Sequence, residues 1–259
     1  MAPKTSPPRY LFIGGLHRSG TSLVNRLVNA LPGAGGITGS AAPENEGVYL
    51  QGAIPHTALL GRPMHFATNP AEHLTEEHPL NCLETRLRLE HDWAPWFDSA
   101  LPWRIEKSPI NLTRMRLMQQ LFPMAQFIVV LRHPEAVATS VASWVDTPPK
   151  ALMDHWLAAH TQLLGDLPYL HAVMVLRYED IIADTPDALR RIAAFLDLPH
   201  ASSPEEISDG NRPYQGATKM THEQAEKAAC WGYLPGLKVA PWNGLLQHPL
   251  RAIREAAAP

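Results

Sequence analysis

A strand, a glycine-rich turn and a helix follow one another in residues 10–31, YLFIGGLHRSGTSLVNRLVNAL. The apolar run at 10–14 predicts a buried strand, and the apolar spacing at 20–31 predicts a helix. The glycines allow a tight turn, and backbone N–H groups at about 18–22 converge on the start of the helix, where its dipole favours an anion. This order restricts the chain to an α/β fold with an anion-binding turn at the end of a strand.

The turn departs at one position from the phosphate-binding motif G-x-x-x-x-G-K-[ST]. Its glycines are Gly15 and Gly20, but Thr21 stands where the motif has a lysine for the β- and γ-phosphates. The nearest cation is Arg18, inside the turn, and the later strand FIVVL ends in Arg132 instead of the aspartate that helps to hold magnesium. These departures disfavour an ATP or GTP hydrolase. A turn that serves only packing is the alternative.

Strand and helix patterns alternate along most of the chain. Short apolar runs predict buried strands at 10–14, 102–106, 126–132 and 172–178. Helices are predicted at 20–31, 111–121, 134–145, about 150–166 and 186–197, with Asn111 and Thr185 as caps and Pro134 and Pro186 in first turns. A capping box, Thr221 with Gln224, opens a further helix. The alternation predicts an α/β, doubly wound, P-loop-like fold, whose mostly parallel central sheet is flanked by helices.

The length of the chain fits one domain. A chain of 259 residues can bury one large core, whereas two complete domains would be cramped. We therefore expect a single domain over residues 1–259. Segments 32–101 and 200–259 are loop-rich, and insertions of this kind over a rigid sheet form pockets. We expect these two segments to supply a pocket and a lid.

Composition and cysteine count disfavour several classes of protein. A net charge of −3 gives no overall field for nucleic acid or an anionic membrane, so we expect neither as a partner. Cys82 and Cys230 lack the CxxC spacing of zinc sites. His73 and His78, five residues apart, do not share a helical face, and no metal site is predicted. The first nine residues contain no apolar signal core and no uncharged apolar run reaches 18 residues, so a cytoplasmic location is expected. A luminal domain trimmed from a longer membrane protein is the alternative, because its sequence would look similar.

Residues 106–144, EKSPINLTRMRLMQQLFPMAQFIVVLRHPEAVATSVASW, contain a second set of anion-binding groups. Arg132 ends a predicted strand, Pro134 starts a helix, and Ser140 lies nearly two turns into it. An arginine and a hydroxyl in this relation can bracket a second phosphate, separate from the one at the first turn. The sequence thus predicts two phosphate positions without metal ligands.

These motifs together resemble those of the sulfotransferases that use 3′-phosphoadenosine 5′-phosphosulfate (PAPS). GGLHRSGTSL is similar to their 5′-phosphosulfate loop, close to the PRSGTTL form of tyrosylprotein sulfotransferases and many bacterial members. FIVVLRHPEAVATS is similar to their 3′-phosphate motif, an arginine followed eight residues later by a serine. EKSPINL and LRYEDIIADTPDALRRIAAFLDLP also match the bacterial branch, and the resemblance runs from about residue 10 to 200.

The resemblance implies a role for each matching residue. The 5′-phosphosulfate end is assigned to Arg18, Ser19, Gly20, Thr21 and Ser22, and the 3′-phosphate to Arg132 and Ser140. Lys107 matches a lysine near the sulfuryl group in the tyrosylprotein branch, where a cation stabilises developing charge. In the late loop 210–220 the candidate contacts are Arg212 and Lys219, although the arginine-lysine-glycine triplet of cytosolic members is absent. Arg177 and Asp180 of RYED are expected to pair locally at a strand end.

The proton acceptor is left open by the sequence. In the tyrosylprotein branch a glutamate some twenty residues beyond the loop arginine takes this role, and the corresponding stretch APENEGVYLQ offers Glu44 and Glu46. Glu44 is the nearer match after the helix. His17, inside the loop, is a rival base. Trp93, Trp96 and Trp103 are candidates for the acceptor pocket, with core packing as their alternative use.

The resemblance therefore implies a sulfotransferase that moves the sulfuryl group of PAPS, without a metal, to a hydroxyl or amine. The acceptor is expected to be a small molecule, a sugar or a carrier-bound metabolite. Two alternatives remain from the residues: a P-loop kinase with a degenerate loop, and a non-catalytic nucleotide-binding module.

Overall fold

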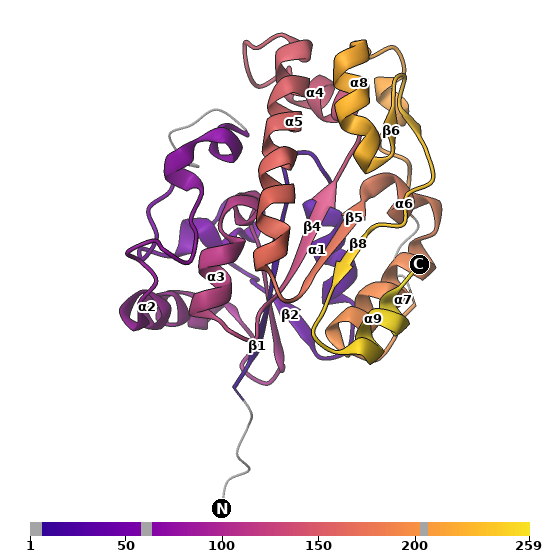
Figure 1. Ribbon diagram of the computed structural model, residues 1–259. Coiled ribbons are helices and arrows are strands. Elements are labelled where there is room, and N and C mark those ends of the chain that lie inside the picture. The colour runs from indigo at the N-terminus through magenta and orange to yellow at the C-terminus, as the bar shows by residue number, and fades with distance from the viewer. Residues whose placement is uncertain (1–6, 58–63, 203–206) are drawn as a thin grey trace, which may run out of the picture.

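The computed structural model describes residues 7–57, 64–202 and 207–259. Its centre is a six-stranded sheet in the order β2-β3-β1-β4-β5-β8 (Figure 1). The strands are β1 (Arg9–Gly14), β2 (Ala34–Gly36), β3 (Trp103–Lys107), β4 (Gln126–Leu131), β5 (Val173–Arg177) and β8 (Leu245–Gln247). Strands β1 to β5 are parallel to their neighbours, and β8 pairs antiparallel with β5. The predicted mostly parallel α/β sheet is confirmed.

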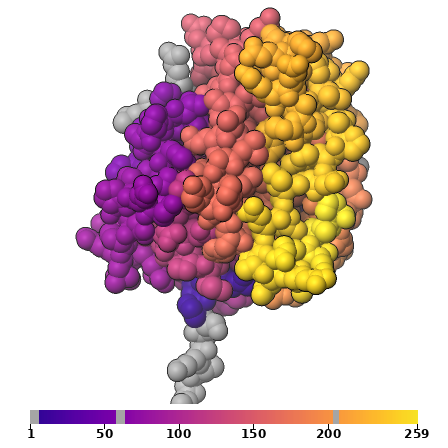
Figure 2. All heavy atoms as spheres, in the orientation of Figure 1, coloured from indigo at the N-terminus to yellow at the C-terminus, as the bar shows by residue number. Residues whose placement is uncertain are grey.

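Helices cover both faces of this sheet. They are α1 (Thr21–Asn29), α2 (Leu83–Trp93), α3 (Met115–Leu121), α4 (Pro134–Val141), α5 (Pro149–Asp166), α6 (Tyr178–Ala183), α7 (Thr185–Leu196), α8 (His222–Ala228) and α9 (Arg251–Ala257). A short hairpin, β6 (Tyr233–Leu234) with β7 (Lys238–Val239), forms a separate pair. In the space-filling view α5 lies between purple segments from the first half of the chain and yellow C-terminal residues (Figure 2).

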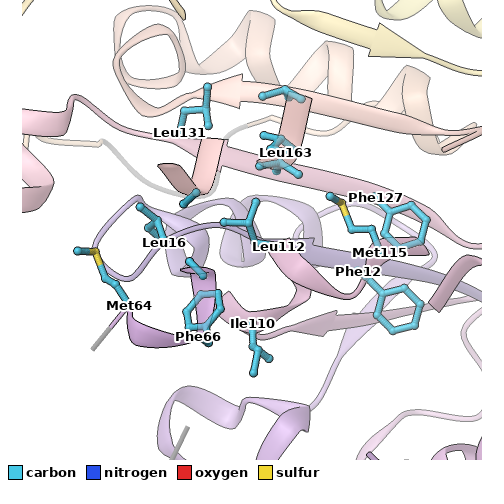
Figure 3. Packing of buried hydrophobic residues seen from close by; sticks show 14 of the residues in the cluster. Phe12, Leu16, Met64, Phe66, Ile110, Leu112, Met115, Phe127, Leu131 and Leu163 are labelled. Atoms are coloured by element: carbon cyan, nitrogen blue, oxygen red, sulfur yellow. The ribbon is translucent and has the colours of Figure 1, made fainter. Parts of the chain in front are cut away.

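Alternate residues of the strands feed two hydrophobic clusters, because successive strand side chains point to opposite faces. Phe12 and Phe127 pack with α3 and α5, whereas Leu11 and Ile128 pack with α1 and α7. Figure 3 shows Leu16 and Phe66 gathered at one end of the first cluster. The side chain of Leu16 therefore anchors the turn after β1 in the core.

The order of the strands positions the site. The chain passes from β1 outward to β2 and β3 on one side, and β4 and β5 lie on the other. In open α/β sheets ligands bind where the strand order reverses, outside the carboxyl ends of the strands. Here that point lies beside the turn between β1 and α1.

Two helix starts differ from the sequence prediction. The side chain of Asn111 is turned inward and donates to the Ile13 carbonyl, and residues 109–113 form a short 3-10 helix before α3. The cap of α7 is Asp184, whose carboxylate accepts from the Asp187 N–H, while Thr185 Oγ1 donates to a carbonyl of the preceding turn. Both predictions were wrong, because each side chain found a partner other than the first free N–H groups of its helix.

Two local predictions about the second half of the chain are confirmed. Thr221 and Gln224 form the predicted capping box at the start of α8. Arg177 donates to both carboxylate oxygens of Asp180 at 2.7 Å, so the RYED charges pair at the end of β5. The predicted helices at 20–31, 134–145, about 150–166 and 186–197 correspond to α1, α4, α5 and α7.

Candidate active site

The turn between β1 and α1 has the backbone that an anion-binding loop needs. Gly20 has φ of 100°, and a Cβ there would lie 2.8 Å from the ring of Tyr178. Arg18 also has a left-handed backbone, with φ of 67°. Helix α1 begins at Thr21, and the first N–H groups of a helix lack partners inside it. The loop therefore presents backbone donors and an exposed arginine on the same side.

Arg18 connects this loop to the second predicted anion position. Its Nε donates to the Ser140 hydroxyl oxygen at 2.7 Å, across the gap between the loop and α4. Tyr214 donates to the same oxygen at 3.0 Å. Burial alone would raise the pKa of Tyr214, but hydrogen bonds to Ser140 and Arg18 and the charges of Arg18 and Arg132 lower it overall. The residues expected at the two ends of one ligand are thus in direct contact.

Arg132 ties the loop to the late segment of the chain. Its guanidinium donates to the Arg18 carbonyl at 2.9 Å, to the Gly210 carbonyl at 2.6 Å and to Asn211 Oδ1 at 2.8 Å. It also lies 4.4 Å from the ring centre of Tyr178, which is a cation–π distance. Arg132 is buried, so its charge is held at the floor of the site.

The late loop contributes residues other than the two predicted cations. Lys219 lines a neighbouring cavity with Glu135 and Lys238, which Asn211 and Tyr214 also line, and Arg212 is exposed. Asn211, which directly precedes Arg212, contacts Arg132, and Tyr214, which lies between the two cations in sequence, contacts Ser140. The polar and aromatic run GNRPY was the available signal for them. The nucleotide contacts of Arg212 and Lys219 stay predictions.

A buried acid and a buried lysine face each other beside the loop. Lys107 Nζ lies 2.9 Å from Glu46 Oε1, and both residues are less than a tenth exposed. Burial raises the pKa of Glu46 above that of an ordinary carboxyl, although the charge and hydrogen bond of Lys107 oppose this rise. Glu44 is exposed instead and accepts a hydrogen bond from Ser22 Oγ at 2.9 Å. The two candidate bases therefore stand in different surroundings.

The segment that carries Glu46 is fixed by three hydrogen bonds to its backbone. Glu106 accepts from the Gly47 N–H at 2.9 Å, and Trp93 Nε1 donates to the Gly47 carbonyl at 2.9 Å. The next N–H, of Val48, donates to Ser108 Oγ at 3.1 Å. We refer to Glu106, Ser108 and Trp93 as the Gly47 clamp. Glu106 is not among the residues predicted from the motifs, although a carboxylate inside a buried strand is a visible signal.

His17 lines the same cavity and lies near Lys107. Its Nδ1 accepts a hydrogen bond from the Met64 N–H at 3.1 Å, and its ring meets Phe66 edge to face. Burial, together with the nearby charge of Lys107, lowers the pKa of His17 to about 4. The ring is therefore neutral near pH 7.

A cavity of about 510 Å³ brings most of the predicted residues together. Its lining residues are His17, Arg18, Gly20, Thr21, Ser22, Arg26, Glu44, Glu46, Pro109, Arg132 and Trp144. Lys107 and Ser140 are buried and bonded to lining residues, Glu46 and Arg18. Ser19 is fully buried, and its N–H already donates to the Leu16 carbonyl at 3.1 Å, so it does not line the cavity. Trp144, absent from the predicted set, packs against the Arg18 guanidinium.

The remaining histidines and tryptophans lie outside this cavity. In the described ranges 7–57, 64–202 and 207–259 there is no group of three His, Cys, Asp or Glu side chains arranged to hold a metal ion. His73 binds the carboxylate of Asp166. Trp93 and Trp103 are buried in the core, and Trp96 packs at its edge. Among the described residues no helix has both the length and the apolar character needed to cross a membrane.

Comparison with models of protein families gives one match. A model described as the sulfotransferase family matches residues 8–202. The sulfotransferase domain of the olefin synthase from Synechococcus PCC 7002 has a TM-score of 0.53 and 19% identity, over 90% of this chain and 98% of that one. A sulfotransferase from Alicyclobacillus acidocaldarius has a TM-score of 0.49 and 16% identity, over 88% and 92% of the chains. No match was found among curated proteins. At these identities the structural likeness concerns the fold.

Proposed function

This chain belongs to the sulfotransferase family, and we propose that it transfers the sulfuryl group of PAPS to a hydroxyl or amine. The observation that carries the proposal is the 510 Å³ cavity, which joins a glycine loop, a buried arginine and a buried acid–lysine pair. The acceptor is a small molecule, a sugar or a carrier-bound metabolite. The proposed step uses no metal, because its charged groups are side chains that line the cavity or, as for Lys107, bond to a lining residue.

The donor nucleotide spans the loop and the Arg132 region. The free N–H groups at the start of α1 bind the 5′-phosphosulfate end, where the helix dipole favours an anion. Arg132, Ser140 and Tyr214 form a cluster of donors that suits the 3′-phosphate. Arg18 lies between these groups and neutralises charge from both ends. This division of roles explains why the loop functions without a lysine at position 21.

Glu46 is the better candidate for the base. Its burial raises the pKa, which makes its carboxylate a stronger proton acceptor than an exposed one. As the acceptor oxygen or nitrogen attacks sulfur, it gives its proton to Glu46. A new bond forms between the acceptor and sulfur while the bond from sulfur to the 5′-phosphate oxygen breaks. The products are the sulfated acceptor and adenosine 3′,5′-bisphosphate (PAP).

Lys107 acts on the leaving group in the same step. Its ammonium group is buried beside the cavity, where an unscreened charge has a large effect on nearby oxygens. It stabilises the negative charge that develops on the departing phosphate oxygen. The ion pair with Glu46 holds both groups in place before the ligands arrive.

The direct test is binding followed by turnover. Titration calorimetry with PAP measures the nucleotide site, and PAPS with a labelled sulfuryl group, mixed with panels of phenols, sugars and amines, measures transfer. Failure to bind PAP and PAPS would end the proposal. A magnesium-dependent rise in melting temperature with ATP, absent with PAP, would favour the kinase instead. Binding without any transfer, in the presence of a broad panel, would favour the non-catalytic module.

A further inference from the structure

The position of the proton on His17 is fixed by a backbone contact. The Met64 N–H can only donate, so the Nδ1 atom that accepts from it at 3.1 Å carries no proton. In a neutral imidazole the single ring proton then resides on Nε2. His17 is thus held as the Nε2–H tautomer, in a ring that lines the cavity.

The surroundings of the ring keep it in that state. Lys107 approaches from β3, and Met64 and Phe66 pack from the segment that follows residue 63. A buried positive neighbour and apolar walls disfavour a second proton, and the pKa of about 4 leaves the ring neutral above roughly pH 5. An Nε2 atom that already carries its proton cannot accept another from the substrate. His17 is therefore unsuited to the role of base.

We propose that His17 is a catalytic residue of another kind, a neutral donor whose Nε2–H binds an oxygen of the sulfuryl group. The inference rests on the proposed function. His17 precedes Arg18 in the loop assigned to the 5′-phosphosulfate, and its ring lies near Lys107, the cation assigned to the sulfuryl end. A neutral N–H adds a hydrogen bond to the transferring group without competing with Glu46 for the acceptor proton.

Two substitutions separate the two nitrogen atoms of the ring. In His17→Asn the amide oxygen takes the place of Nδ1, so the Met64 N–H keeps an acceptor while the Nε2 donor is lost. In His17→Gln the longer amide reaches the place of Nε2, but the Met64 N–H loses its partner. Two ligands complete the design, because PAPS has the sulfuryl group and PAP lacks it.

Calorimetry without an acceptor then measures the dissociation constants of both ligands for both variants. We expect His17→Asn to weaken the binding of PAPS by about tenfold or more, which is the effect of losing a hydrogen bond to a charged group, and to leave the binding of PAP unchanged. His17→Gln is expected to regain part of the PAPS affinity. An equal loss for both ligands in His17→Asn would overturn the proposal, because the ring would then only support the loop. Unchanged PAPS affinity in that variant would overturn it as well.

Imidazole ¹⁵N spectra provide a measurement that needs no ligand. The expected spectrum shows a protonated Nε2 and an unprotonated Nδ1 between pH 6 and 8. The opposite tautomer, or a ring that takes up a second proton in this range, would overturn the inference. Failure of the proposed function is a distinct result, since wild-type protein would then bind neither PAP nor PAPS.

Discussion

Replacement of Ser140 by alanine tests the assignment of the 3′-phosphate. The Ser140 oxygen already accepts two hydrogen bonds, from Arg18 at 2.7 Å and from Tyr214 at 3.0 Å. A hydroxyl has two acceptor positions and one hydrogen, so its own O–H remains for a ligand. Loss of a hydrogen bond to a charged phosphate costs about 1.5–3 kcal/mol, or roughly 10- to 150-fold in the dissociation constant.

The assay compares two nucleotides by calorimetry. PAP has the 3′-phosphate and adenosine 5′-monophosphate lacks it, so Ser140→Ala should weaken the binding of PAP and leave the binding of adenosine 5′-monophosphate unchanged. Ser143→Ala is the matched control, because Ser143 is exposed, three residues further on, and bonds only to the Ser140 carbonyl at 3.4 Å among the described contacts. Equal weakening of both nucleotides by Ser140→Ala would refute the reasoning, since the hydroxyl would then act on the rest of the nucleotide or on the fold.

Three further predictions follow from the acid–lysine pair and from α7. Glu46→Gln should lower the rate of sulfuryl transfer by about 10²- to 10⁴-fold and leave PAP binding intact, whereas Glu44→Gln should change this rate little. If Glu44→Gln caused the larger loss in a labelled-PAPS assay, the base would be Glu44. The rate of sulfuryl transfer should fall as the pH drops through the raised pKa of Glu46. Lys107→Met should shift this fall to higher pH, because the charge of Lys107 lowers the pKa of Glu46. A shift to lower pH would contradict the pairing of the two residues. Asp184→Ala should reduce the free energy of unfolding by about 0.5–2 kcal/mol in a urea titration, and Thr185→Ala by less, because Asp184 is the cap.

The sequence predicts the central strands well and the edges of the sheet poorly. Strands β1, β4 and β5 are buried, mostly apolar runs, so their hydrophobicity identifies them, whereas β3, WRIEK, is buried although three of its five residues are charged. The edge strands β2 and β8 have three residues each, AGG and LLQ, and neither is long enough to show a pattern. Their pairing comes from neighbours far away in the sequence. The single-domain organisation and the cytoplasmic location stay predictions.

The candidate site shows a similar division. Motifs with fixed spacing, the glycine loop and the Arg132–Ser140 pair, lead to residues that meet in space. The sequence favours Glu44 slightly over Glu46 because its match after the helix is nearer, but the loop conformation decides which carboxylate turns inward. Only the fold shows that Glu46 meets Lys107 while Glu44 faces solvent and Ser22. The assigned roles of these residues remain to be measured.

The Gly47 clamp has a consequence for protein engineering. The segment with Glu46 is fastened to β3 and α2, whereas Arg18 and Arg132 are fastened to α4 and the late loop. On the proposed function, we therefore expect that the segment around Glu46 can be exchanged between relatives without disturbing the contacts of Arg18 and Arg132. A chain that receives a grafted segment around Glu46 needs residues equivalent to Glu106, Ser108 and Trp93. Without them, the grafted carboxylate would not be held within ion-pair distance of Lys107.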